Sequence, residues 1–268
     1  MRKRLRSARQ TYRAWLLLAV GMAGCHPGNQ EAKQLRASCG AGKTDACQAY
    51  AVKLTKGEYV LRDDAAAATL FDRTCSDGVA NGCARLGELY ESGRGTTRDT
   101  ARAAALYGQA CDGGAVEGCT RLAVLLREGK GVPKNPARAV GLFQRACTAG
   151  EMHACSHLGS LYATGEGVDR DPSRAAALFD QGCKSSIASG CSGLARLTVE
   201  GAGVTRDEKR AAELYKTACD GRDAVGCFEL SNMYASGRGV AQNLDQANSL
   251  KWRACRLGHA AACPKRES

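Results

Sequence analysis

The sequence predicts an all-α protein built from repeated 36-residue helical hairpins. Three observations predict it: phased cysteine pairs, apolar columns at helical spacing, and a glycine loop before each second helix. Fourteen of the fifteen cysteines form C-x7-C pairs, and each pair begins 36 residues after the previous one. The pairs are Cys39/Cys47, Cys75/Cys83, Cys111/Cys119, Cys147/Cys155, Cys183/Cys191, Cys219/Cys227 and Cys255/Cys263. This phasing indicates a repeat array, in which each hairpin contacts only its neighbours.

The first helix of each hairpin is predicted from columns that follow the first cysteine of a pair. A leucine stands eleven residues after that cysteine, and the next residue is always Gly, Ala or Ser. The leucines are Leu86, Leu122, Leu158, Leu194 and Leu230. Positions eight, eleven, twelve and fifteen after the cysteine share one helical face, so we expect these side chains to pack inward.

A Gly-x-Gly-Val loop follows the first helix at 129–132, 165–168, 201–204 and 237–240. Its first glycine suits the left-handed residue that ends a helix. The first hairpin has Tyr59 in place of the second glycine, and Thr96 replaces the valine in the second hairpin. The second helix is predicted to begin after an Asp or Asn whose side chain accepts backbone N–H groups. These N-caps are Asp63, Asp99, Asn135, Asp171, Asp207 and Asn243.

Each C-x7-C segment connects the end of one hairpin to the start of the next, so an antiparallel turn would bring its two sulfurs together. We expect local disulfides, each adding about 2–3 kcal/mol by the chain-entropy argument. Zinc binding by paired thiolates is the alternative. A structural zinc site needs four ligands, usually from more closely spaced cysteines, whereas each turn here offers two and no adjacent histidine.

The N-terminus predicts export. A basic stretch reaches Arg13 and an apolar stretch of residues 14–24 follows, which fits a signal peptide of residues 1–24. The sequence Met22-Ala23-Gly24-Cys25 resembles a bacterial lipobox, so Cys25 is the expected lipidation site; cleavage after Ala23 with a free Cys25 thiol is the alternative. The predicted domains are a lipidated N-terminus with a short capping helix (25–38), the array of six full hairpins and a terminal half-hairpin (39–263), and a tail (264–268).

The hairpin of residues 147–182 carries the features of a known family. Its Leu158-Gly159, Tyr162, Gly-x-Gly-Val loop and Asp171 cap resemble the Sel-one-like repeat, a relative of the tetratricopeptide repeat, and its C-x7-C pair is similar to that of bacterial cysteine-rich Hcp proteins. The likeness extends over residues 39–263. It implies an α/α superhelix (solenoid), a disulfide in every hairpin and a periplasmic or secreted location. Cysteine-rich members are often labelled β-lactamases, whereas the wider family is mostly described as protein or peptide adaptors.

No catalytic constellation accompanies this resemblance. No Ser or Thr is followed three residues later by Lys, as a serine β-lactamase requires. His153 and His157 share a helical face, but the Glu of H-E-x-x-H is missing and no third ligand is evident. We therefore predict no metal and no cofactor, leave catalytic residues unassigned, and regard the chain as a non-enzyme, with weak β-lactam binding or hydrolysis as the alternative.

A stripe along the first helices varies from hairpin to hairpin, at six, ten, thirteen and seventeen residues after the first cysteine. Fixed packing columns beside a variable stripe favour a binding surface, although the stripe could simply face solvent. The predicted contact residues are Arg85, Glu88, Arg121, His157, Arg196, Glu229 and Asn232.

The expected partner is a protein, a peptide or a peptidoglycan fragment. Nucleic acid is not expected: the net charge is +11, but without the six basic residues of the first 24 positions the chain has 32 basic and 27 acidic residues, spread along its length. The chain is expected to be a monomer that contacts membrane only through its anchor, at the periplasmic face of the outer membrane, in the periplasm, or secreted.

Overall fold

The computed structural model describes residues 27–263. The predicted signal peptide (1–24), the lipidation of Cys25 and the tail (264–268) lie outside these residues. None of the helices within 27–263 has both the length and the apolar character that crossing a membrane requires.

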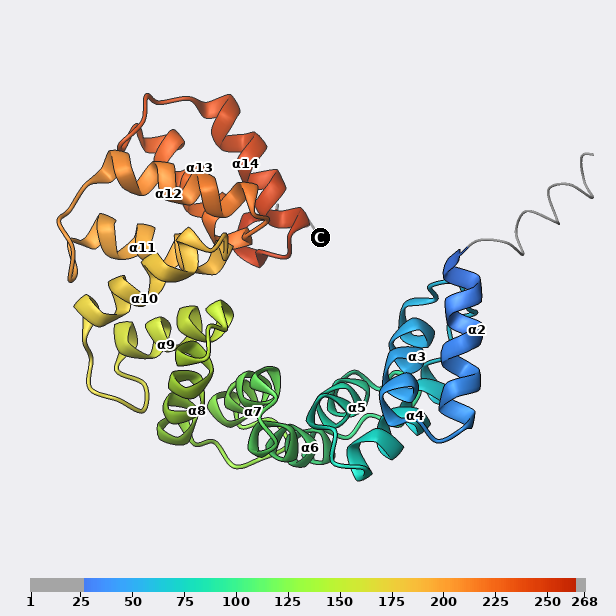
Figure 1. The fold of residues 1–268 in the computed structure, drawn as a ribbon. Coiled ribbons are helices and arrows are strands. Elements are labelled where there is room, and N and C mark those ends of the chain that lie inside the picture. Colours follow the sequence, from blue (N-terminus) through green and yellow to red (C-terminus); the bar gives the residue numbers. More distant parts are fainter. Residues whose placement is uncertain (1–26, 264–268) are drawn as a thin grey trace, which may run out of the picture. The chain divides into compact units, whose positions relative to one another are not determined.

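The described chain is all-α, as predicted, and contains no strand. Consecutive helices pack as hairpins that stack as a solenoid (Figure 1). The helices are α2 (Pro27–Gly40), α3 (Thr44–Lys56), α4 (Asp64–Ser76), α5 (Ala80–Ser92), α6 (Thr100–Asp112), α7 (Val116–Glu128), α8 (Pro136–Thr148), α9 (Met152–Thr164), α10 (Pro172–Lys184), α11 (Ala188–Glu200), α12 (Glu208–Asp220), α13 (Ala224–Ser236) and α14 (Leu244–Arg256), followed by the 3-10 helix η1 (Ala260–Ala262).

The chain divides into two compact units, one ending at Ala115 and the other beginning at Val116. In the N-terminal unit, α2 to α6 pack in sequence order, each against the next. In the C-terminal unit, α7 to α14 do the same, and the first helices α9, α11 and α13 also contact one another in order. The first helices of successive hairpins therefore form a layer of their own within the C-terminal unit.

The predicted helix signals are confirmed. Each of the six Asp and Asn caps accepts a hydrogen bond from the backbone N–H three residues later, at 2.9–3.0 Å. The predicted leucine column is buried, and so is the column of aromatic residues on the second helices. These aromatic residues are Phe71, Tyr107, Phe143, Phe179 and Tyr215. A Cβ added to Gly87 or Gly159 would meet the ring of Tyr107 or Phe179, so the small column makes room for the ring of the same hairpin.

The cysteines form the predicted local disulfides, with Cα–Cα distances of 4.5–4.8 Å. The bonds are Cys39–Cys47, Cys75–Cys83, Cys147–Cys155, Cys183–Cys191, Cys219–Cys227 and Cys255–Cys263. Cys111 and Cys119 are disulfide-bonded as well. The zinc alternative is therefore wrong, because these cysteines are not thiolates. Disulfides persist in oxidising compartments, so this chain belongs outside the cytoplasm.

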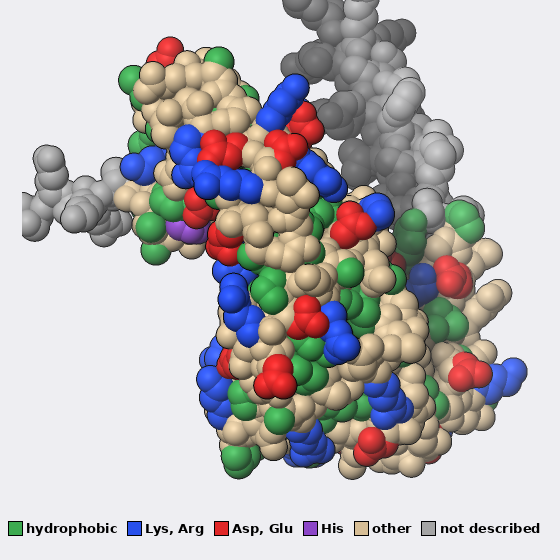
Figure 2. Space-filling model, turned by 90° about the vertical axis from the view of Figure 1, so that its left-hand side faces the viewer, with side chains coloured by type: hydrophobic (Ala, Val, Ile, Leu, Met, Phe, Trp, Pro, Cys, Tyr) green, Lys and Arg blue, Asp and Glu red, His purple; other side chains and the backbone are tan. Residues whose placement is uncertain are grey.

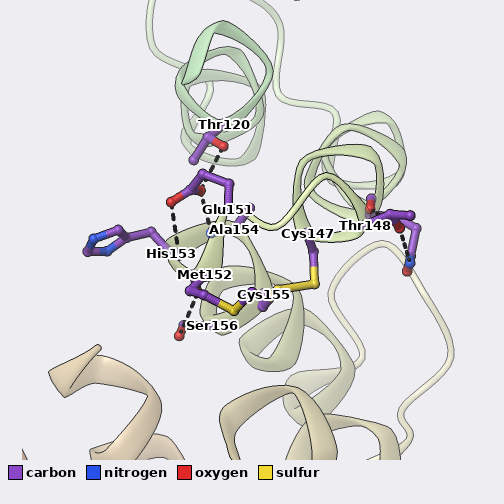
Figure 3. Close-up of a disulfide and its surroundings, with 10 residues drawn as sticks. Thr120, Cys147, Thr148, Glu151, Met152, His153, Ala154, Cys155 and Ser156 are labelled. Atoms are coloured by element: carbon purple, nitrogen blue, oxygen red, sulfur yellow. Dashed lines mark hydrogen bonds between the residues drawn. A yellow bond between two sulfur atoms is a disulfide. The ribbon is translucent and has the colours of Figure 1, made fainter. Parts of the chain in front are cut away.

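The turn between hairpins is also tied by hydrogen bonds (Figure 3). Beside Cys147–Cys155, the Glu151 carboxylate accepts hydrogen bonds from the backbone N–H groups of His153 (3.0 Å) and Ala154 (2.7 Å). It also accepts one from the Thr120 hydroxyl at 3.0 Å, which belongs to the preceding first helix, α7. One carboxylate thus caps α9 and holds it against its neighbour.

The second loop glycine lies against the start of the second helix of the preceding hairpin. Gly203 has φ 70°, and a Cβ there would overlap the Pro172 backbone. The first hairpin, where Tyr59 replaces this glycine, reverses the arrangement: Tyr59 adopts φ 60° and its ring covers Gly28 of α2, where a Cβ would collide with it. The loop of the first hairpin therefore still packs against the start of the preceding helix, but here the glycine, Gly28, lies on the helix and the larger residue, Tyr59, lies in the loop.

Gly203→Ala is expected to destabilise the protein by about 2–4 kcal/mol, because the new Cβ is strained at positive φ and overlaps the Pro172 backbone. Gly150→Ala is the matched control: Gly150 has φ 89°, but nothing lies within 4 Å of its Cβ position. It should cost only the strain, about 1–2 kcal/mol. Urea unfolding of the disulfide-intact protein, followed by circular dichroism, measures both losses. Equal losses would contradict the packing argument.

Candidate functional site

A groove of about 540 Å³ runs over the first helices of the C-terminal unit. Helices α9, α11 and α13 supply most of its lining, and second helices α10 and α12 supply its floor. Eight of the lining residues belong to the variable stripe identified in the sequence: His157, Ser160, Ser189, Gly193, Arg196, Glu200, Val225 and Glu229. These eight stripe positions of α9, α11 and α13 therefore share one concave surface.

The aromatic ring of each second helix packs against the residue fourteen positions later, which lies on the first helix of the next hairpin. These contacts determine the floor of the groove. Phe143 stacks on His157, with ring centroids 5.1 Å apart and planes inclined by 24°. The corresponding partner of Phe179 is Gly193, which has no side chain, so the Phe179 ring lies directly against the helix backbone. A Cβ at Gly193 would lie 2.6 Å from the Phe179 ring, so the ring takes the place that a charged or imidazole side chain has in other hairpins and gives the groove an apolar floor there.

Tyr215 brings an unused hydroxyl to this floor. Its side chain is only 4% exposed, it lines the groove, and its hydroxyl has no hydrogen-bond partner among the described residues. Tyr107, in the same column of the N-terminal unit, instead donates to the Glu91 carboxylate at 2.7 Å. Burial raises the pKa of the Tyr215 phenol, and the nearby Glu229 carboxylate raises it further. The hydroxyl therefore stays protonated and can donate.

The charged residues around the groove are unevenly paired. Arg196 and Glu200 are exposed and form no ion pair with any residue that the structure describes. Glu229 accepts only a long 3.4 Å hydrogen bond from the Asn232 amide. Arg127, by contrast, is bound to Glu166 at 3.0 Å, and this bond lowers the Glu166 pKa. One cation and two carboxylates are left for a ligand.

His157 forms part of the wall between α9 and α8. Its imidazole is partly buried against Phe143, and burial lowers its pKa below the ordinary value, with the Arg127 charge acting in the same direction. At neutral pH the ring is uncharged and packs as an aromatic side chain. Within residues 27–263, no group of three or more His, Cys, Asp or Glu side chains is placed to hold a metal ion.

The structure brings three of the seven predicted contact residues into the groove, His157, Arg196 and Glu229. Asn232 lies beside them through its bond to Glu229. Arg121 pairs with Glu117 of its own helix at 3.5 Å and does not line the groove.

The other two predicted residues, Arg85 and Glu88, lie in the N-terminal unit. They pair with each other at 3.1 Å and line a separate pocket of about 240 Å³. The structure thus divides the predicted contact set between different local surfaces.

Sequence reasoning did not single out Tyr215, Gly193 or Glu200. Tyr215 belongs to the buried aromatic column of the second helices. Its signal in the sequence is the hydroxyl, because the hairpins on its N-terminal side have Phe143 and Phe179 in that column. A hydroxyl in a packed column needs a hydrogen-bond partner, and this requirement could have marked the position.

Comparison with known proteins identifies the class. The Sel1 repeat family matches residues 80–114, 116–151, 153–186, 188–223 and 224–259, so this chain belongs to that family. The resemblance found in the sequence is confirmed. Sel1 repeats form scaffolds that generally mediate protein–protein interaction and are not catalytic. A search of curated proteins finds no match.

Solved structures agree with this class. A protective antigen of uropathogenic Escherichia coli with an SLR fold is 26% identical (TM-score 0.74), covering 86% of this chain and 50% of its own, so this chain spans half of its length. A Sel1 repeat protein from Oxalobacter formigenes is 22% identical (TM-score 0.75), covering 92% and 95%. Helicobacter pylori cysteine rich protein B is 28% identical (TM-score 0.39), covering 47% and 90%.

The lowered pKa of His157 predicts a pH-dependent stability. As the pH falls below 6.5, the ordinary pKa of histidine, the unfolded chain takes up a proton at His157 more readily than the folded chain does. The free energy of unfolding therefore decreases as the pH falls from 6.5 toward the lowered pKa of the folded state. His157→Asn should reduce the difference between unfolding free energies measured at about pH 7.5 and about pH 5. His153→Asn, exposed four residues earlier on α9, is the control. Identical pH profiles for wild type and His157→Asn would contradict the assignment.

Proposed function

We propose that this protein is an exported, lipid-anchored scaffold that binds a protein or peptide segment in the groove over α9, α11 and α13. The observation that carries the proposal is the gathering of eight stripe residues around one 540 Å³ groove. Grooves of a few hundred cubic ångströms with a few placed polar groups are typical binding sites.

An extended peptide suits the shape and chemistry of this surface. The first helices lie in succession, so a chain crossing them meets residues of several hairpins in turn. The Phe179 ring gives a side chain an apolar surface to lie on, and the serines and Tyr215 offer hydrogen bonds to peptide groups. A peptidoglycan fragment, which also carries a peptide, is the other occupant compatible with this chemistry.

Placement at the periplasmic face of the outer membrane is part of the proposal. The disulfides support a location outside the cytoplasm, and the lipobox-like sequence ending at Cys25 supports an anchor. We propose that the chain acts as a monomer.

A groove contact predicts site-specific crosslinking in cells. A photoreactive phenylalanine analogue placed at the exposed groove residue Ser189 should crosslink to a discrete partner, whereas the same analogue at Lys209, an exposed residue of α12, should not. Arg196→Glu should change the Ser189 crosslink severalfold, because it reverses the charge of the one groove arginine that forms no ion pair with a described residue.

The matched control is Arg210→Glu, a charge reversal at an exposed residue of α12 outside the groove. It should leave the crosslink unchanged. A crosslink of equal yield from Ser189 and Lys209, or one insensitive to Arg196→Glu, would refute binding in the groove.

β-Lactam hydrolysis is the alternative function that the resemblance raises. The groove contains serines, among them Ser156, Ser160 and Ser192, but no lysine lies among its lining residues to activate them. Purified mature protein is therefore expected to show no turnover of a chromogenic cephalosporin above the buffer rate. Turnover that follows the protein through purification and disappears in Ser160→Ala would establish the alternative instead.

A further inference from the structure

We infer that the groove selects a peptide segment carrying one basic side chain, which Glu200 and Glu229 bind while the Tyr215 hydroxyl donates to a neighbouring peptide carbonyl. The inference rests on the proposed function and adds the chemical class of the ligand. It depends on the charge balance of the groove, on the unused hydroxyl of its floor and on the apolar surface of Phe179, Val199 and Val225.

The charge balance favours a cationic ligand. The lining residues include two arginines and three carboxylates, so their formal charges leave an excess of one negative charge. Arg127 is committed to Glu166, and the Asp223 carboxylate caps α13 through the Gly226 N–H. Glu200 and Glu229 remain with one free counter-charge, that of Arg196, and a single basic side chain would neutralise the difference. An acidic segment would instead meet two unpaired carboxylates.

The Tyr215 hydroxyl supplies a fixed hydrogen-bond donor. The Tyr215 hydroxyl forms no hydrogen bond with another described residue, so it can donate to a ligand carbonyl in exchange for water. The ring is held on the floor by the packed column, so little conformational entropy is lost when the bond forms. A peptide backbone presents such a carbonyl at every residue.

The floor and walls of the groove are apolar beside the carboxylates. The aromatic Phe179 floor and the side chains of Val199 and Val225 are apolar surfaces beside the carboxylates. The aliphatic stem of a lysine or arginine can lie along apolar surface while its charged end reaches an anion. Both halves of a basic side chain therefore have a matching surface.

The test uses the mature chain and a displayed library of random peptides as the probe. Selected peptides are expected to share a basic residue. A selected peptide should bind about tenfold more weakly when its lysine or arginine is replaced by norleucine, and about tenfold more weakly to the Glu200→Gln/Glu229→Gln variant. Tyr215→Phe should weaken binding about threefold to tenfold, and it keeps the packing because Phe143 and Phe179 fill the same column.

The control variant Glu213→Gln/Asp245→Asn removes two exposed carboxylates outside the groove and should bind like wild type. Peptides that lack a basic residue, or that bind the Glu200→Gln/Glu229→Gln variant unchanged, would overturn the inference while leaving peptide binding in place. A library that yields no binder, together with the absence of a crosslink at Ser189, would overturn the proposed function and the inference with it.

Discussion

The stacking of hairpins and the depth of the groove depend on one contact, between the aromatic ring of each second helix and the first helices on both sides of it. The Phe179 ring lies against Gly159 of its own hairpin and against Gly193 of the next. Protein interiors are close-packed, so a ring held from two sides fixes the spacing of both neighbours. The residue fourteen positions after the ring then decides what the ring packs against: the His157 imidazole in the case of Phe143, and the helix backbone at Gly193 in the case of Phe179.

Local bonds at the turns keep this packing in place although much of the core is alanine. Alanine buries little apolar surface, and a thin array of hairpins has a high ratio of surface to volume. The disulfide at each turn restricts the unfolded chain, and carboxylates such as Glu151 tie a turn to the preceding first helix. Since stability comes from the columns and turns, the stripe can vary without loss of the fold.

Several polar groups of the groove are not used by the protein itself. Other charged or hydroxyl groups are bound within the chain: Arg85 binds Glu88, Arg127 at the edge of the groove binds Glu166, and Tyr107 binds Glu91. On the face displayed in Figure 2, basic and acidic side chains are interspersed. Arg196, Glu200 and the Tyr215 hydroxyl have no such partner among the described residues, so their interactions remain available to a ligand.

The sequence by itself determined the hairpins, the caps, the loops and the disulfide pairing, because each depends on residues a few positions apart. Asp171 caps α10 by accepting a hydrogen bond from the backbone N–H three residues later, and Cys147 bonds to the cysteine eight residues later. Both could be predicted from spacing. Only the tertiary structure decided which stripe residues act together: it placed Arg196 and Glu229 in one groove and paired Arg121 with Glu117. Such pairings depend on how successive helices cross and on which side chains reach one another, and so does the absence of a described partner for the Tyr215 hydroxyl. The 36-residue period does not encode that geometry.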